Sequence, residues 1–185
     1  MLKQVVNTVQ EADDASLASR AAAGDSRAFS EIVRRYQGPI YNACFRYLGV
    51  RDAEDAAQET FIRAFVHRQS FDPSRPLMPW LITIARRLCL DRLRRQKRVA
   101  FTEDEGTVVA DVSPTAEDSM ASKEELDIVS EGLKTLPEGQ REAIALYHLE
   151  GLAYKEVSDI LGVPIGTVMT WLHRGRTKLR ELVES

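Results

Sequence analysis

The sequence predicts an all-α protein, built as two small helical domains joined by a flexible acidic linker. Apolar residues recur at three- and four-residue steps through most of the chain, and no alternation with a period of two is long enough for a strand. Glycine and proline separate the helical stretches as caps and turns do. We expect a loose arm over 1–13, a first domain over 14–98, the linker over 99–122 and a second domain over 123–185.

The first domain opens with two helices that carry core residues. Asp14 or Ser16 could cap a short first helix, and the Gly24–Asp25 pair should end it and cap the next. Pro39 is expected to interrupt or restart that second helix, because proline lacks the N–H that a helix interior needs. The apolar positions of both helices predict core packing, and no chemistry is assigned to them.

A helix over 52–69 is expected to have two different sides. Carboxylates open it, which suits the positive end of a helix, and one side is apolar. The other side mixes acid, amide and aliphatic groups: Asp55, Gln58, Glu59, Ile62 and Val66. A helix with two such sides usually has two neighbours, so the second is either a partner protein or another helix of this chain.

The helix that follows a proline-rich loop is basic. Arg87, Arg94 and Arg98 recur along one side, and Asp91 is the one acid among seven cations between positions 86 and 98. Such a row suits a nucleic-acid backbone, since each cation releases a condensed counterion, although a merely solvated face is the alternative. Trp80, at the helix start, could pack inward or stack on an unpaired base.

The linker over 99–122 holds glycine, proline, serine and threonine together with six acids, and it lacks helical periodicity. Its acids could serve solubility, or they could occupy a basic nucleic-acid channel in place of the nucleic acid. The formal net charge of -3 is uninformative in itself, because basic and acidic residues are segregated along the chain.

The second domain ends in a helix-turn-helix pattern. Gly162 can end one helix in the left-handed conformation, and Pro164 suits the first turn of the next. That last helix has an apolar stripe expected to face inward, made of Ile165, Val168, Leu172, Gly175 and Leu179. The opposite arc has no acid and consists of Met169, Thr170, His173, Arg174 and Thr177. Such an arc suits phosphates and base edges, and the alternative is an ordinary helical corner.

Four motifs carry a resemblance that covers nearly the whole chain. In chain order they are DAEDAAQETFIRAF, PWLITIARRLCLDRLRR, LPEGQREAIALYHLEGLAYKEVSDILGVPIGTV and LHRGRTKLRE. They resemble the conserved second and fourth regions of bacterial RNA polymerase sigma factors of the sigma-70 family. The two-domain form resembles the extracytoplasmic-function (ECF) group. Several motifs in the right order make the match far more specific than any one of them.

The resemblance implies a promoter-recognition subunit that binds core RNA polymerase and promoter DNA. Docking on the clamp coiled coil of the largest polymerase subunit would involve Asp55, Gln58, Glu59 and Ile62. Single-stranded DNA of the minus-ten element would be captured by the loop over 71–78 and by Trp80, Arg87, Asp91, Arg94 and Arg98. The minus-thirty-five element would be read in the major groove by Thr167, Met169, Thr170, His173 and Arg174, with Arg176 and Lys178 nearer the phosphates.

The same resemblance implies contact with the flap of the second-largest polymerase subunit and control by an anti-sigma factor. The linker would thread toward the active centre and the RNA exit path. We expect a cytoplasmic protein, held at the membrane at most through its anti-sigma factor. No apolar run approaches the length of a bilayer span, and the first residues lack the pattern of a signal peptide.

Four positions depart from the family pattern. Arg87 stands where asparagine is frequent, which affects the identity of the captured base. Met169 stands where lysine or arginine is common, and Trp171 stands where arginine is frequent. We therefore expect electrostatics to contribute less to binding of the minus-thirty-five element, and the sequence preference there to be altered. Ala153 lacks the side-chain cap of the usual serine or threonine, which costs its helix about 1 kcal/mol.

Two other functions explain less of the sequence. A helix-turn-helix regulator that binds duplex DNA without polymerase would leave the two-sided helix over 52–69 and the arginine row without a role. An enzyme is weaker still, because the three histidines have no partners at ligand or catalytic spacing and no glycine-rich phosphate loop is present. We therefore expect no catalysis, no metal and no cofactor.

Overall fold

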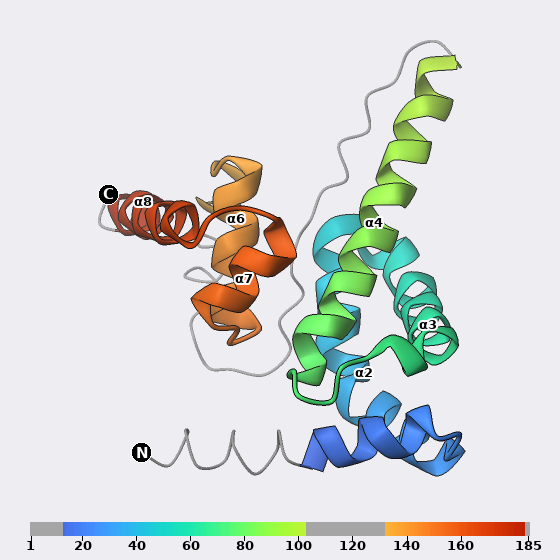
Figure 1. Ribbon diagram of the computed structural model, residues 1–185. Coiled ribbons are helices and arrows are strands. Elements are labelled where there is room, and N and C mark those ends of the chain that lie inside the picture. The colour runs from blue at the N-terminus through green and yellow to red at the C-terminus, as the bar shows by residue number, and fades with distance from the viewer. Residues whose placement is uncertain (1–12, 103–131, 184–185) are drawn as a thin grey trace. The chain divides into compact units, whose positions relative to one another are not determined.

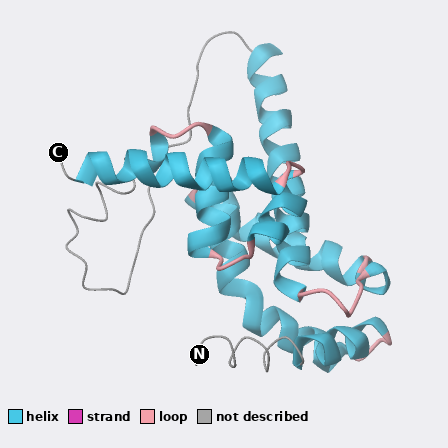
Figure 2. Cartoon of the chain, turned by 60° about the vertical axis from the view of Figure 1, so that its left-hand side comes forward, coloured by secondary structure: helices cyan, strands magenta, loops and turns pink. Residues whose placement is uncertain are grey.

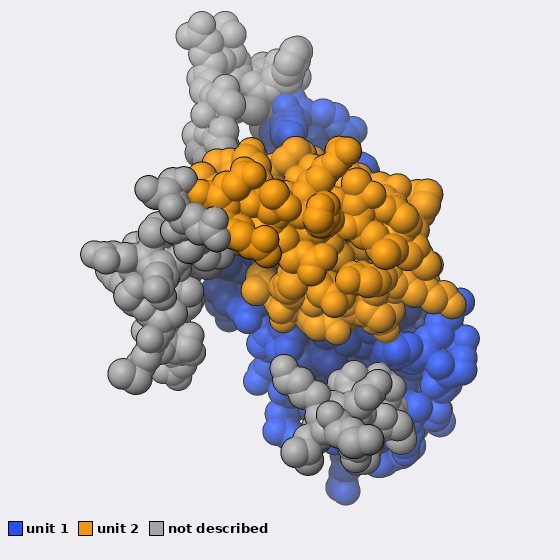
Figure 3. Space-filling view, turned by 90° about the vertical axis from the view of Figure 1, so that its left-hand side faces the viewer, with its two compact units in different colours: residues 1–112 blue, residues 113–185 orange. Residues whose placement is uncertain are grey.

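The structure is a computed structural model that describes residues 13–102 and 132–183. The chain divides into two compact units, within 1–112 and 113–185, shown in different colours in Figure 3. The described residues of both units form helices joined by short turns and include no strand (Figure 2), which confirms the all-α prediction. The predicted arm and most of the predicted linker lie outside the described residues.

Unit 1 is a helical bundle (Figure 1). A first helix over 13–22 is followed by α2 (Ser26–Leu48), α3 (Val50–Val66), the short 3-10 helix η1 (Arg68–Ser70) and α4 (Leu77–Thr102). The helices α2, α3 and α4 all contact one another around a core of fully buried side chains that includes Ile40, Leu81 and Leu88. The last helix continues through Thr102, past the predicted end of the first domain at Arg98.

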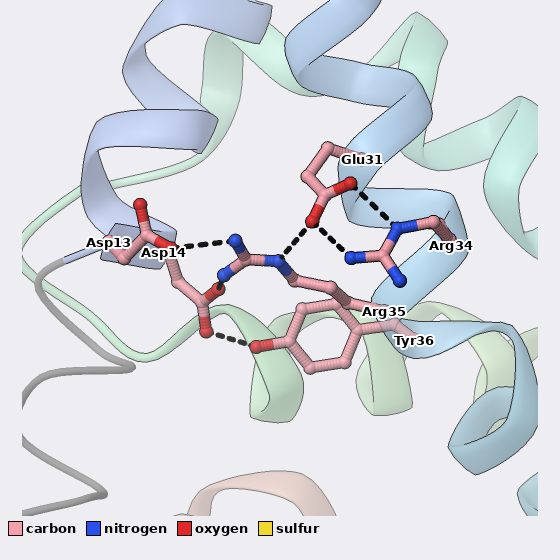
Figure 4. Close-up of polar contacts among 6 residues, drawn as sticks. All are labelled: Asp13, Asp14, Glu31, Arg34, Arg35 and Tyr36. Atoms are coloured by element: carbon pink, nitrogen blue, oxygen red, sulfur yellow. Dashed lines mark hydrogen bonds and ion pairs between the residues drawn. The ribbon is translucent and has the colours of Figure 1, made fainter.

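The entry into α2 has the predicted cap and one unpredicted anchor. Asp25 caps α2 by accepting hydrogen bonds from the amides of Arg27 (2.9 Å) and Ala28 (3.2 Å). The expected cap at Asp14 or Ser16 is wrong, because both residues lie inside the first helix. The buried carboxylate of Asp14 points to α2. There it accepts hydrogen bonds from the Arg35 guanidinium and the Tyr36 hydroxyl (Figure 4).

Pro39 lies inside α2 and does not interrupt it, so the predicted break is wrong. Proline clashes with the Cβ of the residue before it, and Gly38 has no Cβ. The packing of α2 against α3 and α4 holds the helix together despite the lost N–H.

Unit 2 contains the predicted helix-turn-helix. Helical residues 132–134 come first, followed by α6 (Glu138–Ile144) and the π-helical turn η2 (Ala145–Leu149) that continues it. Then come α7 (Tyr154–Leu161) and α8 (Ile165–Val183). Both α6 and α7 contact α8, whose Val168 and Leu172 are fully buried.

The turn between α7 and α8 forms as predicted. Gly162 adopts the left-handed conformation (φ 69°, ψ 33°), and its N–H donates to the Ser158 carbonyl at 2.9 Å. The Ser158 hydroxyl donates to the Val163 carbonyl at 2.6 Å, which braces the turn. At the start of α7, Ala153 offers no cap, but its N–H donates to the Glu156 carboxylate at 2.7 Å. Half of a capping box therefore remains.

Candidate nucleic-acid interface

The five side chains predicted on the arc of α8, Met169, Thr170, His173, Arg174 and Thr177, are all exposed. We call this set the reading arc. Its threonine hydroxyls donate to backbone carbonyls one turn earlier, at 2.8 Å for Thr170 and 3.1 Å for Thr177. The predicted inward stripe is buried at Val168, Leu172 and Gly175. Ile165 departs from it, because no described helix covers the first turn of α8 there, and its side chain is 43% exposed.

Main-chain carbonyls hold two further cations of α8. The Arg176 Nε donates to the Leu172 carbonyl at 3.1 Å, and the Lys178 Nζ donates to the Thr135 carbonyl at 3.0 Å. Thr167 is half-buried at the start of the helix. Because the sequence from Ile165 to Arg180 contains no carboxylate, this helix presents positive charge without nearby acid over about four turns.

Close apolar packing fixes α8 on α6. The Trp171 ring lies so near Gly139 of α6 that a Cβ added there would stand 2.6 Å from the ring. Gly175 meets Ile144 in the same way, at 2.4 Å from an added Cβ. Trp171 thus serves the interface within unit 2 and not the reading arc, which sequence spacing did not reveal.

The basic half of α4 separates into exposed and internally bound cations. Arg87, Asp91, Arg94 and Arg98 are exposed, as predicted, and Arg94 lies 3.4 Å from the Asp91 carboxylate. Arg92 turns the other way and donates to the Glu59 carboxylate of α3 at 2.6 Å. The sequence carried a signal for this difference, since residue 92 follows the buried Leu88 and Cys89 by four and three positions.

Trp80 supports the loop between α3 and α4 from inside. Its ring lies 5.1 Å from that of Phe71, and both line an apolar depression with Arg68 and Leu77. The indole therefore takes the inward of its two expected positions. In the loop itself, Asp72 accepts hydrogen bonds from the Ser74 amide (2.9 Å) and hydroxyl (2.7 Å), which hold the pKa of its carboxyl below the usual value.

The second side of α3 is a mixed apolar and acidic surface. Asp55 and Gln58 are exposed, and Ile62 and Val66 are each 64% exposed, so no described helix of unit 1 covers them. Glu59 differs from its neighbours. The Arg92 guanidinium, and then that of Arg63 at 2.6 Å, lower the pKa of its carboxyl. This carboxylate is engaged within unit 1, whereas the other three predicted docking residues face outward.

Metal and membrane chemistry find no support among the described residues. No group of three histidine, cysteine, aspartate or glutamate side chains could hold a metal ion there. No helix in the described ranges is long and apolar enough to cross a membrane. The thiols of Cys44 and Cys89 are both buried in unit 1.

Comparison with known proteins agrees with this arrangement. The family model for sigma-70 region 2 matches residues 32–99, and that for sigma-70 region 4 matches residues 126–179. The ECF sigma factor SigW of Bacillus subtilis (strain 168) is 41% identical over 170 aligned positions, which cover 85% of this chain and 90% of SigW. The ECF sigma-E factor of Haemophilus influenzae is 32% identical over 185 positions, covering 95% of this chain and 97% of that factor.

Two solved structures share the fold. CnrH, solved with the cytosolic domain of CnrY, matches with a TM-score of 0.68 and 29% identity, covering 93% of this chain and 97% of that one. The sigma factor RpoE of Bartonella quintana, solved with the anti-sigma factor NepR, matches with a TM-score of 0.74 and 25% identity, covering 84% and 96%. With both sigma regions in order and relatives that match along nearly their full length, the chain belongs to the ECF group of sigma-70 RNA polymerase sigma factors, which direct promoter-specific initiation of transcription.

Proposed function

We propose that α8 and α4 divide promoter recognition in this sigma factor. In this assignment α8 enters the major groove at the minus-thirty-five element. The reading arc and Thr167 lie toward the base edges, and Arg176 and Lys178 lie nearer the phosphates. The observation that carries the assignment is the exposed, carboxylate-free reading arc on the second helix of a helix-turn-helix.

The minus-ten element is assigned to α4 and the loop before it. Arg87 and Asp91 are exposed on the same side and would line a pocket for a base taken out of the stack, with Arg94 and Arg98 along the backbone. Binding such a base would offset part of an unstacking cost of a few kcal/mol. Trp80 is half-exposed beside Phe71 at the start of α4, and it stays assigned to this DNA-binding surface.

Core polymerase would bind the second side of α3. Asp55, Gln58 and Ile62 point outward there, and the exposed Val66 extends the apolar part. Glu59 contributes through its bond to Arg92, which ties α3 to α4 behind the docking surface. The flap of the second-largest polymerase subunit would contact unit 2, as the family membership leads us to expect.

An anti-sigma factor is the expected regulator. The relative RpoE of Bartonella quintana, solved with the anti-sigma factor NepR, supports this. The exposed side of α3 is a surface that a regulator could cover. The protein would act by binding and not by catalysis. It would work in the cytoplasm, because promoter DNA and polymerase are found there in bacteria.

The docking assignment can be tested with two apolar residues of α3. Ile62→Asp should abolish or strongly weaken binding to core polymerase, because it places a charge in the proposed interface. Val50→Asp is the matched control, since Val50 is 67% exposed at the other end of the same helix. Pull-down with core polymerase gives the affinities, and circular dichroism checks the fold. Equal binding by the two variants would remove the docking surface from this side of α3.

The minus-ten assignment can be tested on the reconstituted holoenzyme. Arg87→Ala should reduce promoter opening more than it reduces binding to the closed duplex. Permanganate footprinting measures the opening. Lys97→Ala is the control, because Lys97 is an exposed cation elsewhere on α4. The rival regulator is tested with the same preparations: sequence-specific binding to promoter duplex without core polymerase, together with no association with core, would favour it.

A further inference from the structure

The reading arc contains an apolar element at its N-terminal flank. The Met169 side chain is 52% exposed, and Ile165, one turn earlier on the same flank, is 43% exposed. Residues four apart on a helix are neighbours, so the two form one short apolar strip. Gly166 lies beside it, with nothing within 4 Å of the position where a Cβ would stand. The surface around Met169 is therefore open to close approach.

Cations flank this strip on the later turns of the same helix. They are Arg174 and Arg176, toward the C-terminal end, and no carboxylate of α8 precedes Glu181. Recognition helices of helix-turn-helix proteins contact base edges with their N-terminal residues. The apolar strip lies near the N-terminal end of α8 and the cations lie on its later turns. The strip is therefore expected at the base edges, with positive charge beside it.

The major groove offers one prominent apolar group, the C5-methyl group of thymine. We propose that Met169 reads a thymine methyl group in the minus-thirty-five element. This inference rests on the assignment of α8 to that element and adds a chemical identity for one base pair. The methionine side chain is unbranched and polarisable, which lets it follow the position of the methyl group. Ile165 extends the apolar surface one turn earlier.

The test removes the methyl group alone. The promoter is first identified by sequencing the transcripts that the reconstituted holoenzyme initiates on genomic DNA. Each thymine of the minus-thirty-five element is then replaced by deoxyuridine, and holoenzyme affinity is measured by competition. One position should lose about fourfold in affinity, the factor that corresponds to one buried methyl or methylene group. Deoxyuridine lacks the C5-methyl group of thymidine but keeps the same hydrogen-bonding groups. The loss of affinity therefore reports the apolar contact with the methyl group.

Variants connect that loss to one side chain. Holoenzyme with Met169→Ala should bind the thymidine and deoxyuridine duplexes equally. Holoenzyme with Met169→Leu should keep most of the difference in affinity between them. Leu149→Ala is the matched control, because Leu149 is an exposed apolar residue of unit 2 outside α8, at 61% exposure. It should retain the full fourfold ratio. Since Met169 is exposed, its replacement leaves the core of unit 2 intact, and circular dichroism verifies this.

The outcomes separate the inference from the assignment beneath it. If no thymine is methyl-sensitive while the holoenzyme still prefers the element over a scrambled duplex, the inference is overturned and the assignment of α8 stands. If Met169→Ala keeps the methyl sensitivity, another side chain reads the methyl group and the inference is again overturned. If element and scrambled duplex bind equally, the assignment of α8 fails as well.

Discussion

The two helices assigned to DNA are held in place by different forces. Close apolar packing holds α8, with Gly175 against Ile144 and Trp171 against Gly139. In α4, no residue from 90 to 98 is buried. That half of the helix is tied to α3 by a cation of its own, Arg92, which donates to Glu59 at 2.6 Å. The internal ion pair belongs to α4, whereas the internal contacts of the α8 cations Arg176 and Lys178 are made to main-chain carbonyls.

This difference has energetic consequences. Close apolar packing is insensitive to salt, and overfilling it lowers the free energy of unfolding by about 1 to 3 kcal/mol. A partly exposed ion pair contributes about 1 kcal/mol or less and weakens as salt screens it. The position of the reading arc should therefore be robust to ionic conditions, and the basic half of α4 should be the more adjustable of the two. An adjustable helix suits the handling of melted DNA, and a fixed one suits the reading of duplex.

The largest effect is expected from overfilling the contact between α8 and α6. Gly175→Leu should destabilise unit 2 by about 3 kcal/mol, because the new side chain must displace Ile144. Gly166→Ala in the same helix should do the opposite and stabilise it by up to about 1 kcal/mol, since its Cβ enters open space and alanine favours helices. Hydrogen exchange of the α6 and α8 amides measures both changes. A gain of similar size from both replacements would show that helix propensity, and not packing, sets the stability of α8.

An intermediate effect is expected at a charged residue of the reading arc. Arg174→Ala should cost about 2 kcal/mol of discrimination at one or two base pairs of the minus-thirty-five element. Arg94→Ala on α4 should change holoenzyme affinity for the same duplex far less, because Asp91 already balances that cation in part. Competition assays with single-base variants supply the measurement. A uniform loss over all sequences would instead identify Arg174 as a phosphate contact.

Local sequence signals predicted much of this architecture. The turn at Gly162 and Pro164, the exposed reading arc and the two-sided α3 all follow from periodicity and capping, because neighbours in the chain determine them. Contacts between helices do not follow in this way. The pairing of Arg92 with Glu59 joins side chains far apart in the sequence, so the count of seven cations included Arg92 without revealing its internal partner.

Two further differences have the same origin. Trp171 was read as a lost cation of the DNA surface, yet its ring fills the space over a glycine of α6. Pro39 was expected to break α2, but the glycine before it and the packing of three helices override the local rule. In each case tertiary packing decides what a pattern within one helix leaves open.

The smallest effect concerns the ion pair that holds α4. Glu59→Gln should destabilise unit 1 by about 1 kcal/mol or less at neutral pH, because the pair is partly exposed. The pKa of Glu59 is lowered in the folded protein from its ordinary value of 4.5, so its contribution is complete above that value. It is lost as the pH falls through the folded pKa, where the carboxylate takes up a proton. Denaturant unfolding of the free chain at neutral and acidic pH measures the difference between wild type and variant.

That difference should shrink with acidification, and it should also shrink with added salt. Glu54→Gln is the matched control, because Glu54 is exposed on the same helix and takes part in no ion pair between described residues that would join α3 to α4. Its replacement should leave the stability of unit 1 nearly unchanged under all these conditions. If the Glu59→Gln difference instead persists at high salt and low pH, packing and not charge ties α4 to α3. The two DNA-facing helices would then be held by the same kind of force, and the greater adjustability inferred for α4 would have no physical basis.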